Sequence, residues 1–307
     1  MDRGRHIIVG YALVLAGAVL FSSKAIFAKL AFQDLPDAVQ LVALRMAFSL
    51  PAFAAVGLYS VLARRRAGRA LPSWRDSGGA FLSGILGYYL AMIFDFEGLI
   101  YISAQLERLV LFVYPVYVMV LGALFFRARL SWTGMGAAAV TFGGLAVVFG
   151  SGLTSGGPNV AAGTALVTVS AICFAFYQLF AKKLIAAMGS VLFTTVSMSG
   201  ASVASLAHYA IASGGLGFTA PPHFIMLAAA TGLFATVIPA FLVNAGLARV
   251  GPQVTAMIST VSPLATIYLA IVVLGERFTL ADALGTALVI GGIGFYTWHD
   301  LRRGGSS

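Results

Sequence analysis

The stretch LVLFVYPVYVMVLGALFF, residues Leu109–Phe126, runs through 18 positions without a charged side chain. A helix needs about 20 mostly apolar residues to cross the hydrocarbon core of a membrane. Apolar and polar residues do not alternate in this stretch, as they would in a strand of a membrane barrel. The stretch therefore predicts a transmembrane α-helix, because a helix satisfies all of its backbone groups internally.

Working outward, the rest of the chain repeats this pattern. Short separators that carry charges, Gly or Pro divide it into stretches of similar length, and one of them is Arg249-Val-Gly-Pro252. The sequence thus predicts an all-α polytopic membrane protein with ten transmembrane helices, at about 7–30, 38–62, 78–95, 99–125, 131–150, 161–181, 189–212, 224–244, 252–274 and 280–298.

The composition excludes a soluble protein. Apolar residues make up 60% of the 307 positions and charged residues only 9%, whereas soluble domains are about one quarter charged. The single cysteine, Cys173, excludes an intramolecular disulfide and a metal site built from several cysteines. The net charge of +9 would suggest nucleic acid in a soluble protein, but here it is first a question of topology.

The basic residues orient the chain. With the N-terminus in the cytoplasm, 14 of the 19 Lys and Arg residues fall in cytoplasmic segments and only Arg277 falls outside. Cytoplasmic loops of membrane proteins carry an excess of Lys and Arg. We therefore expect a bacterial inner-membrane protein with both termini in the cytoplasm, in contact with membrane lipids and not with nucleic acid.

The two halves of the chain resemble each other. A shift of 148 residues places Pro115 on Pro263 and Arg129 on Arg277, and a shift of 153 places Phe27-Ala28-Lys29 on Phe180-Ala181-Lys182. Because each copy has an odd number of helices, five, we expect the second copy to have the inverted orientation in the membrane. We expect one repeat over 1–150 and an inverted repeat over 151–303, with 304–307 as a flexible tail or a cloning remnant.

Inverted repeats are typical of secondary transporters, which place their substrate between the two halves. Here Ser262-Pro263-Leu264 precedes Gly275-Glu276-Arg277-Phe278-Thr279, and this pattern in a five-plus-five duplication resembles the EamA branch of the drug/metabolite transporter superfamily. The aromatic-rich helices are similar to those of YddG-like amino-acid exporters. The resemblance implies a ten-helix exporter of small metabolites that works by alternating access.

The first copy departs from the family pattern. Where the second copy has Gly275-Glu276-Arg277, the first has Arg127-Ala128-Arg129, so the acidic residue occurs once. The small four-helix exporters of the superfamily carry a glutamate within their first helix, where this chain has Lys24.

Ionisable residues inside apolar helices cost about 2.5–3.5 kcal/mol each on insertion scales, so they are functional candidates by default. Lys24, Arg45 and Arg108 are predicted to bind substrate, and Asp95 or Glu107 to carry a coupled proton. These charges gather in the outer half of the first repeat, where a water-filled cavity would solvate them. The alternative is a structural ion-pair set, such as Glu107 with Arg45 or Lys24.

Aromatic and hydroxyl side chains complete the predicted substrate site. An ammonium opposite a phenol and an amide would hold a carboxylate and leave room for an apolar group, whereas the simpler alternative is that these side chains only pack helices. Three prolines inside helices are candidate gating points, because a proline removes a backbone hydrogen bond and kinks the helix. The further binding candidates are Phe21, Tyr88, Tyr114, Tyr177, Gln178, Ser259 and Ser262, and the gating candidates are Pro115, Pro239 and Pro263.

Other function classes find little support. There is no phosphate-binding loop for ATP, and no cofactor or metal motif. Ser199 and His208 superficially suggest an intramembrane protease, but nine residues of one helix separate them by about 13 Å along its axis. A channel would need matched polar rings from several copies. The sequence thus predicts a monomeric carrier for small polar metabolites, amino acids first, rather than an enzyme; exporters of other specificity remain an alternative.

Overall fold

The computed structural model describes residues 2–126, 132–155, 158–259 and 261–304. All regular elements in these ranges are helical, which confirms the predicted all-α membrane fold. The first half contains α1 (Asp2–Ser22), α2 (Lys24–Asp34), α3 (Ala38–Arg66), α4 (Trp74–Gly84), η1 (Ile85–Leu90), α5 (Ala91–Tyr101), α6 (Ala104–Phe112), α7 (Tyr114–Phe126) and α8 (Trp132–Ser155). The second half contains α9 (Val160–Met188), α10 (Ser190–Ser213), α11 (Pro222–Gly232), η2 (Leu233–Val237), α12 (Ile238–Ser259), α13 (Val261–Leu274) and α14 (Leu280–Gly304).

Eight helical stretches in this part of the chain are long and apolar enough to cross a membrane, and two further apolar helices are shorter. The eight are Ile7–Asp34, Ala38–Arg66, Trp74–Tyr101, Ala104–Phe126, Trp132–Gly152, Val160–Met188, Ser190–Ser213 and Pro222–Val243, and the shorter two are Val261–Leu274 and Leu280–Phe295. Three boundaries differ from the prediction. The cut expected between 95 and 99 lies within α5, α9 continues past the expected end at 181, and the separator at Arg249–Pro252 lies within the bounds of α12.

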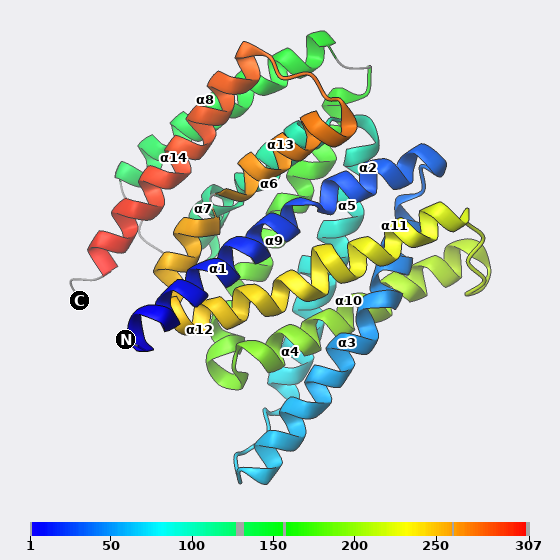
Figure 1. Ribbon diagram of the computed structural model, residues 1–307, viewed down its shortest axis with the longest axis vertical. Helices are drawn as coiled ribbons and strands as arrows, with labels where there is room; N and C mark the ends of the chain where they lie inside the picture. The colour runs from blue at the N-terminus through cyan, green and yellow to red at the C-terminus, as the bar shows by residue number, and fades with distance from the viewer. Residues whose placement is uncertain (1, 127–131, 156–157, 260, 305–307) are drawn as a thin grey trace.

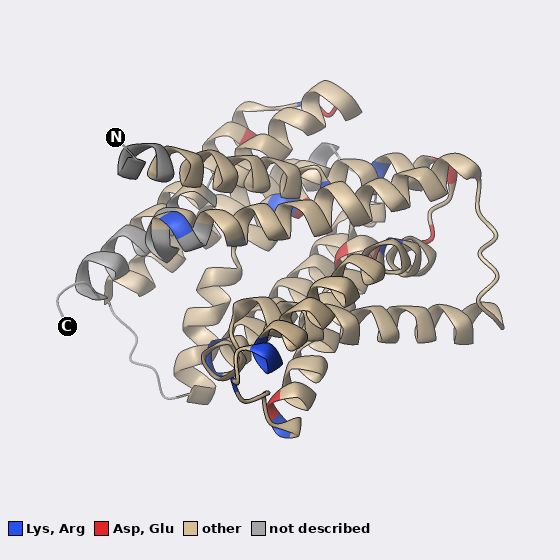
Figure 2. Ribbon diagram, turned by 60° about the horizontal axis from the view of Figure 1, so that its bottom comes forward, with Lys and Arg blue, Asp and Glu red and all other residues tan. Residues whose placement is uncertain are grey.

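The helices pack in pairs that cross between the two halves (Figure 1). Helix α1 packs along α12, α5 along α9, α3 along α10, and α8 along α14. Small residues make these approaches possible: a Cβ atom on Gly144 of α8 would lie 2.7 Å from the backbone oxygen of Gly285 in α14. Figure 2 shows that charged residues occupy few places along the helices.

The first transmembrane stretch is broken at Ser23, although the sequence predicts one continuous helix there. The Ser23 backbone N–H donates to the Leu20 carbonyl at 3.1 Å, which is the tighter i to i−3 spacing. The hydroxyls of Ser22 and Ser23 donate to the carbonyls of Ala18 and Leu20. Such back-bonding by adjacent serines bends helices, so α2 starts anew at Lys24.

Two π-helical turns interrupt other stretches. Element η1 begins at Ile85 and η2 begins at Leu233, 148 residues later. Pro239 is the second residue after η2, and a proline cannot donate the hydrogen bond that a regular helix requires. The Thr236 hydroxyl donates to the Thr231 carbonyl at 2.9 Å, which satisfies one backbone acceptor in the disturbed turn. Such π-bulges are frequent at functional sites.

The other two prolines that the sequence analysis names as gating candidates, Pro115 and Pro263, lie in the first turns of helices. Pro115 is the second residue of α7, directly after the break between α6 and α7 at Val113. Pro263 is the third residue of α13. A missing N–H costs least in a first turn, where the backbone donors have no partner within the helix.

Candidate functional site

Lys24 sits where the first stretch breaks, and its ammonium group enters the space between α5 and α6. It forms an ion pair with Asp95 of α5, and its Nζ lies 3.0 Å from Oε1 of Glu107 in α6. Asp95 is 3% exposed and Glu107 is fully buried. Buried charges of this kind are stable only when they are paired, so one ammonium holds two carboxylates inside the bundle.

Arg45 does not belong to this ion-paired cluster. It lies buried on α3, and its Nε donates to the Thr236 hydroxyl of η2 at 2.8 Å. Its guanidinium stacks over the Phe96 ring with 5.6 Å to the centroid, and Lys24 lies 5.7 Å from the same ring. Two cations therefore contact one aromatic ring, which is a favourable cation–π arrangement.

Arg108 joins the two halves of the chain. From α6 its guanidinium donates to the Ser262 hydroxyl of α13. Ser262 also lies 2.8 Å from the hydroxyl of Ser22, the last residue of α1. The hydroxyl of Thr266 donates to the Ser22 carbonyl at 3.1 Å. Three elements thus meet at the break in the first stretch.

These side chains surround a cavity of about 460 Å³, a volume suited to a small ligand. The predicted residues that line it come from seven elements of the first half and two of the second: Phe21, Lys24, Arg45, Tyr88, Asp95, Arg108, Tyr114, Gln178 and Ser262. Glu107 and Tyr177 are not among the lining residues, but they contact the lining residues Lys24 and Tyr88. The side chain of Ser259 is outside the described part of the chain.

Aromatic side chains form a further part of the cavity lining. The rings of Tyr88 and Tyr177 make an edge contact at 5.0 Å, and Tyr114 meets Phe174 at 5.1 Å. Phe174 and Tyr177 come from the unbroken helix α9. Tyr177 fits because position 87 is glycine, where a Cβ atom would lie 2.3 Å from its ring. The cavity is therefore lined by both charged and aromatic side chains.

Some polar atoms of the site are buried without a hydrogen-bond partner. They are Oδ1 of Asp95, Oε2 of Glu107 and Nε of Arg108. An unpaired buried polar atom costs free energy that a ligand would recover. No group of three or more His, Cys, Asp or Glu side chains that could hold a metal occurs within the described ranges.

Two contributions could not be read from the sequence patterns alone. Thr236 is one of many hydroxyl residues, and only the η2 turn brings it to Arg45. Glu276 lies in the loop after α13 and accepts hydrogen bonds from the backbone N–H groups of Ala104 and Gln105 at 2.7 and 3.2 Å. The Glu276 carboxylate therefore caps the start of α6, the helix that carries Glu107 and Arg108.

Comparison with known proteins agrees with this architecture. The chain matches the EamA-like transporter family twice, over residues 8–150 and 161–298. It is 30% identical to the uncharacterized transporter YcbK of Bacillus subtilis, covering 98% of this chain and 96% of that one. It is 29% identical to an uncharacterized transporter of Archaeoglobus fulgidus over 41% of this chain and 44% of that one. A solved crystal structure with 20% identity superposes with a TM-score of 0.61, covering 95% of this chain and 98% of that one, which supports the fold. The chain thus belongs to the EamA-like transporter family, and it is a multi-pass membrane transporter.

Proposed function

We propose that the protein is a secondary carrier that moves small polar metabolites, amino acids first, across the bacterial inner membrane by alternating access. The observation that carries the proposal is the central cavity, which Lys24, Arg108 and Asp95 line together with aromatic side chains. The resemblance to amino-acid exporters favours export, with both termini in the cytoplasm.

The arrangement of the helices supports an inverted repeat. Each half matches the same family. The pairing of α1 with α12 has its counterpart in the pairing of α9 with α5, and the two π-helical turns begin 148 residues apart. If the two halves exchange their conformations, each of these packed pairs would take up the packing arrangement of the other, while the cavity stays in place. Pro115, Pro239 and Pro263 would let the helices bend during the exchange.

The chemistry of the cavity favours a zwitterion with an apolar part. Arg108 and Lys24 would bind a carboxylate, and the free carboxylate oxygen of Asp95 would accept from an ammonium group. Tyr88, Tyr114 and Phe174 would contact the side chain of the substrate. A substrate carboxylate at Lys24 would compete with Asp95 and Glu107, so either acid could take up a proton as the ion pair opens.

Transport by the purified protein in liposomes tests the proposal. We expect exchange of ¹⁴C-labelled amino acids without ATP, and loss of this exchange when excess unlabelled amino acid is present. A variant of the exposed Lys183, Lys183→Ala, is the matched control for the removal of a lysine and should exchange normally. Absence of exchange for all twenty amino acids would exclude them as substrates, and single-channel currents in a planar bilayer would favour a channel.

A further inference from the structure

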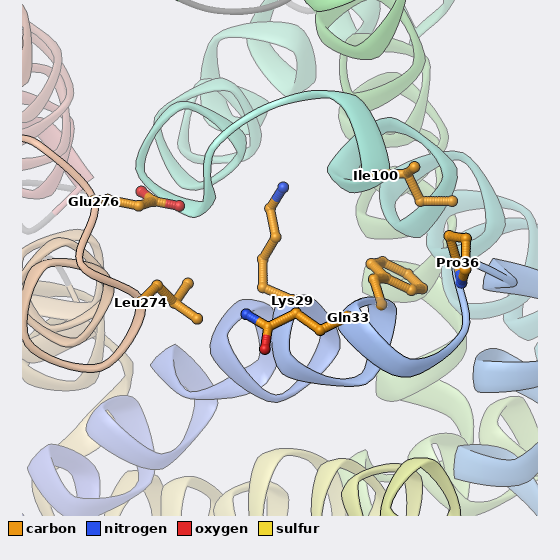
Figure 3. A pocket seen from close by; sticks show the side chains of 7 residues that line it. Lys29, Gln33, Pro36, Ile100, Leu274 and Glu276 are labelled. Atoms are coloured by element: carbon orange, nitrogen blue, oxygen red, sulfur yellow. The ribbon is translucent and has the colours of Figure 1, made fainter. Parts of the chain in front are cut away.

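A second pocket lies farther along α2 than the central cavity. It has a volume of about 410 Å³ and is lined by Lys29, Phe32, Gln33, Pro36, Ile100, Leu274 and Glu276. We call it the Lys29 pocket (Figure 3). Lys29 is five residues beyond Lys24, which corresponds to about 7.5 Å along the helix. With the proposed orientation, the Lys29 pocket is on the outer side of the central cavity.

One helical turn separates the two cavities. The backbone N–H of Ala104 in α6 binds Glu276 of the Lys29 pocket. Glu107, three residues later in the same helix, binds Lys24 of the central cavity. The first turn of α6 is therefore the wall between a pocket on the outer side and the ion-paired cluster inside.

The Lys29 pocket presents one positive and one negative group, and the two form no direct ion pair with each other. Figure 3 shows the side chains of Lys29 and Glu276 projecting into the same space from different walls. The Lys29 ammonium has no hydrogen bond or ion pair to any residue that the structure describes. The Glu276 carboxylate is fixed by two backbone N–H groups, so its position does not depend on Lys29.

We propose that the Lys29 pocket binds a zwitterion, a molecule that carries both an ammonium group and a carboxylate or phosphate group. The ammonium of Lys29 would bind the anionic group, and the free lone pairs of Glu276 would accept from the ligand's ammonium group. A simple anion would be repelled by Glu276 and a simple cation by Lys29. Phe32, Ile100 and Leu274 offer apolar contacts for a carbon chain.

This inference rests on the proposed function when the zwitterion is a free amino acid, because the pocket is then a second station on the transport path. The head group of phosphatidylethanolamine has the same chemistry and is the other source. The two sources differ in how the ligand reaches the pocket, from water or from the bilayer, and the test therefore varies the two separately.

Chemical protection of a cysteine in the pocket tests the inference. Gln33→Cys is introduced into a Cys173→Ser background, and its reaction with a water-soluble thiol reagent is followed in vesicles of phosphatidylglycerol alone. We expect a mixture of the twenty amino acids to slow this reaction at least about fivefold. Vesicles that contain phosphatidylethanolamine and no added amino acid form the second arm, where the same slowing would identify the lipid head group.

Charge-neutral variants decide whether the pocket groups cause the protection. Lys29→Gln and Glu276→Gln should each abolish it, whereas Lys183→Gln should leave it unchanged. No protection in either arm, or equal protection in Lys29→Gln, would overturn the inference. Amino-acid transport without protection of the cysteine would overturn only the proposal that the Lys29 pocket binds a zwitterion. Protection without amino-acid transport would overturn only the proposed carrier function.

Discussion

The stretch Ile7–Asp34 and the helix Val160–Met188 begin the two halves of the chain, but they contribute opposite chemistry. The first breaks at Ser23 and presents Lys24 to two carboxylates. The second is unbroken and presents Phe174 and Tyr177 at the corresponding place. Two copies that match one family thus contribute different side chains to one cavity, an ammonium from the first and an aromatic ring from the second. Such a lining suits a substrate with a polar and an apolar part.

A second difference lies farther along the chain from the two π-helical turns, where the first half ends α5 and starts a new helix but α12 of the second half continues. In the first half a new helix, α6, begins at Ala104, and Glu276 from the other half binds its first N–H groups. The residue at the position of Ala104 in the second half is Pro252, which has no N–H to bind. The acid at the position of Glu276 is replaced by Ala128, outside the described residues. An acid is therefore present only in the half of the pattern whose partner helix has a free backbone N–H at this position.

Removal of the positive charge of Lys24, the feature that distinguishes the first stretch from α9, should have the largest effect on stability and transport. Lys24→Ala leaves Asp95 and Glu107 buried without their cation, and breaking a buried ion pair costs about 3–5 kcal/mol. We expect a lower unfolding temperature and a loss of amino-acid exchange of about 100-fold or more, which corresponds to about 2.7 kcal/mol of transport barrier. Unfolding in detergent and exchange in liposomes measure the two effects.

A neutral triple variant separates stability from transport in this prediction. Lys24→Met with Asp95→Asn and Glu107→Gln removes the ammonium together with the two carboxylates that it binds, and replacing both sides of a buried ion pair is often harmless to stability. We expect its unfolding temperature to recover while exchange remains absent. Transport by the triple variant would show that the cluster is structural and that substrate binds elsewhere.

Loss of the Glu276 cap should have an intermediate effect, on stability. Glu276→Ala removes the acceptor for two backbone N–H groups of α6, and losing a helix cap costs about 0.5–2 kcal/mol. Glu276→Gln retains one oxygen acceptor and should lose about half as much. The unfolding temperatures of both variants in detergent give the comparison. Equal stability of Glu276→Ala and the unaltered protein would mean that the cap contributes nothing.

Much of the fold and part of the site could be predicted from the sequence, because both follow from the cost of burial. Apolar stretches must cross the membrane, and a charge such as Lys24 or Arg108 inside one must meet a partner or a cavity. The structure places both side chains at the central cavity. Which carboxylates pair with Lys24 depends on how the helices are rotated, and no sequence pattern records that rotation.

The breaks in the helices were less predictable. A π-helical turn such as η1 has no strong local signature, since residues Ile85–Leu90 contain neither a proline nor a charged side chain that would mark an irregular turn. The paired serines before Lys24 are a weak signal for a bend. The binding of Glu276 to α6 joins residues 172 positions apart in the chain, and only the packed structure brings them together.

The smallest expected effect concerns the aromatic side of the cavity. Tyr177 contacts Tyr88 and Phe193 through its ring, and the cavity is lined by Tyr88 instead. Tyr177→Phe keeps the ring and should change the exchange rate by no more than about threefold, which is about 0.7 kcal/mol. Tyr114→Phe removes a hydroxyl from a residue that does line the cavity, so it should reduce exchange more than Tyr177→Phe does. A larger loss in Tyr177→Phe than in Tyr114→Phe, measured as initial exchange rates in liposomes, would mean that the Tyr177 hydroxyl takes part in transport.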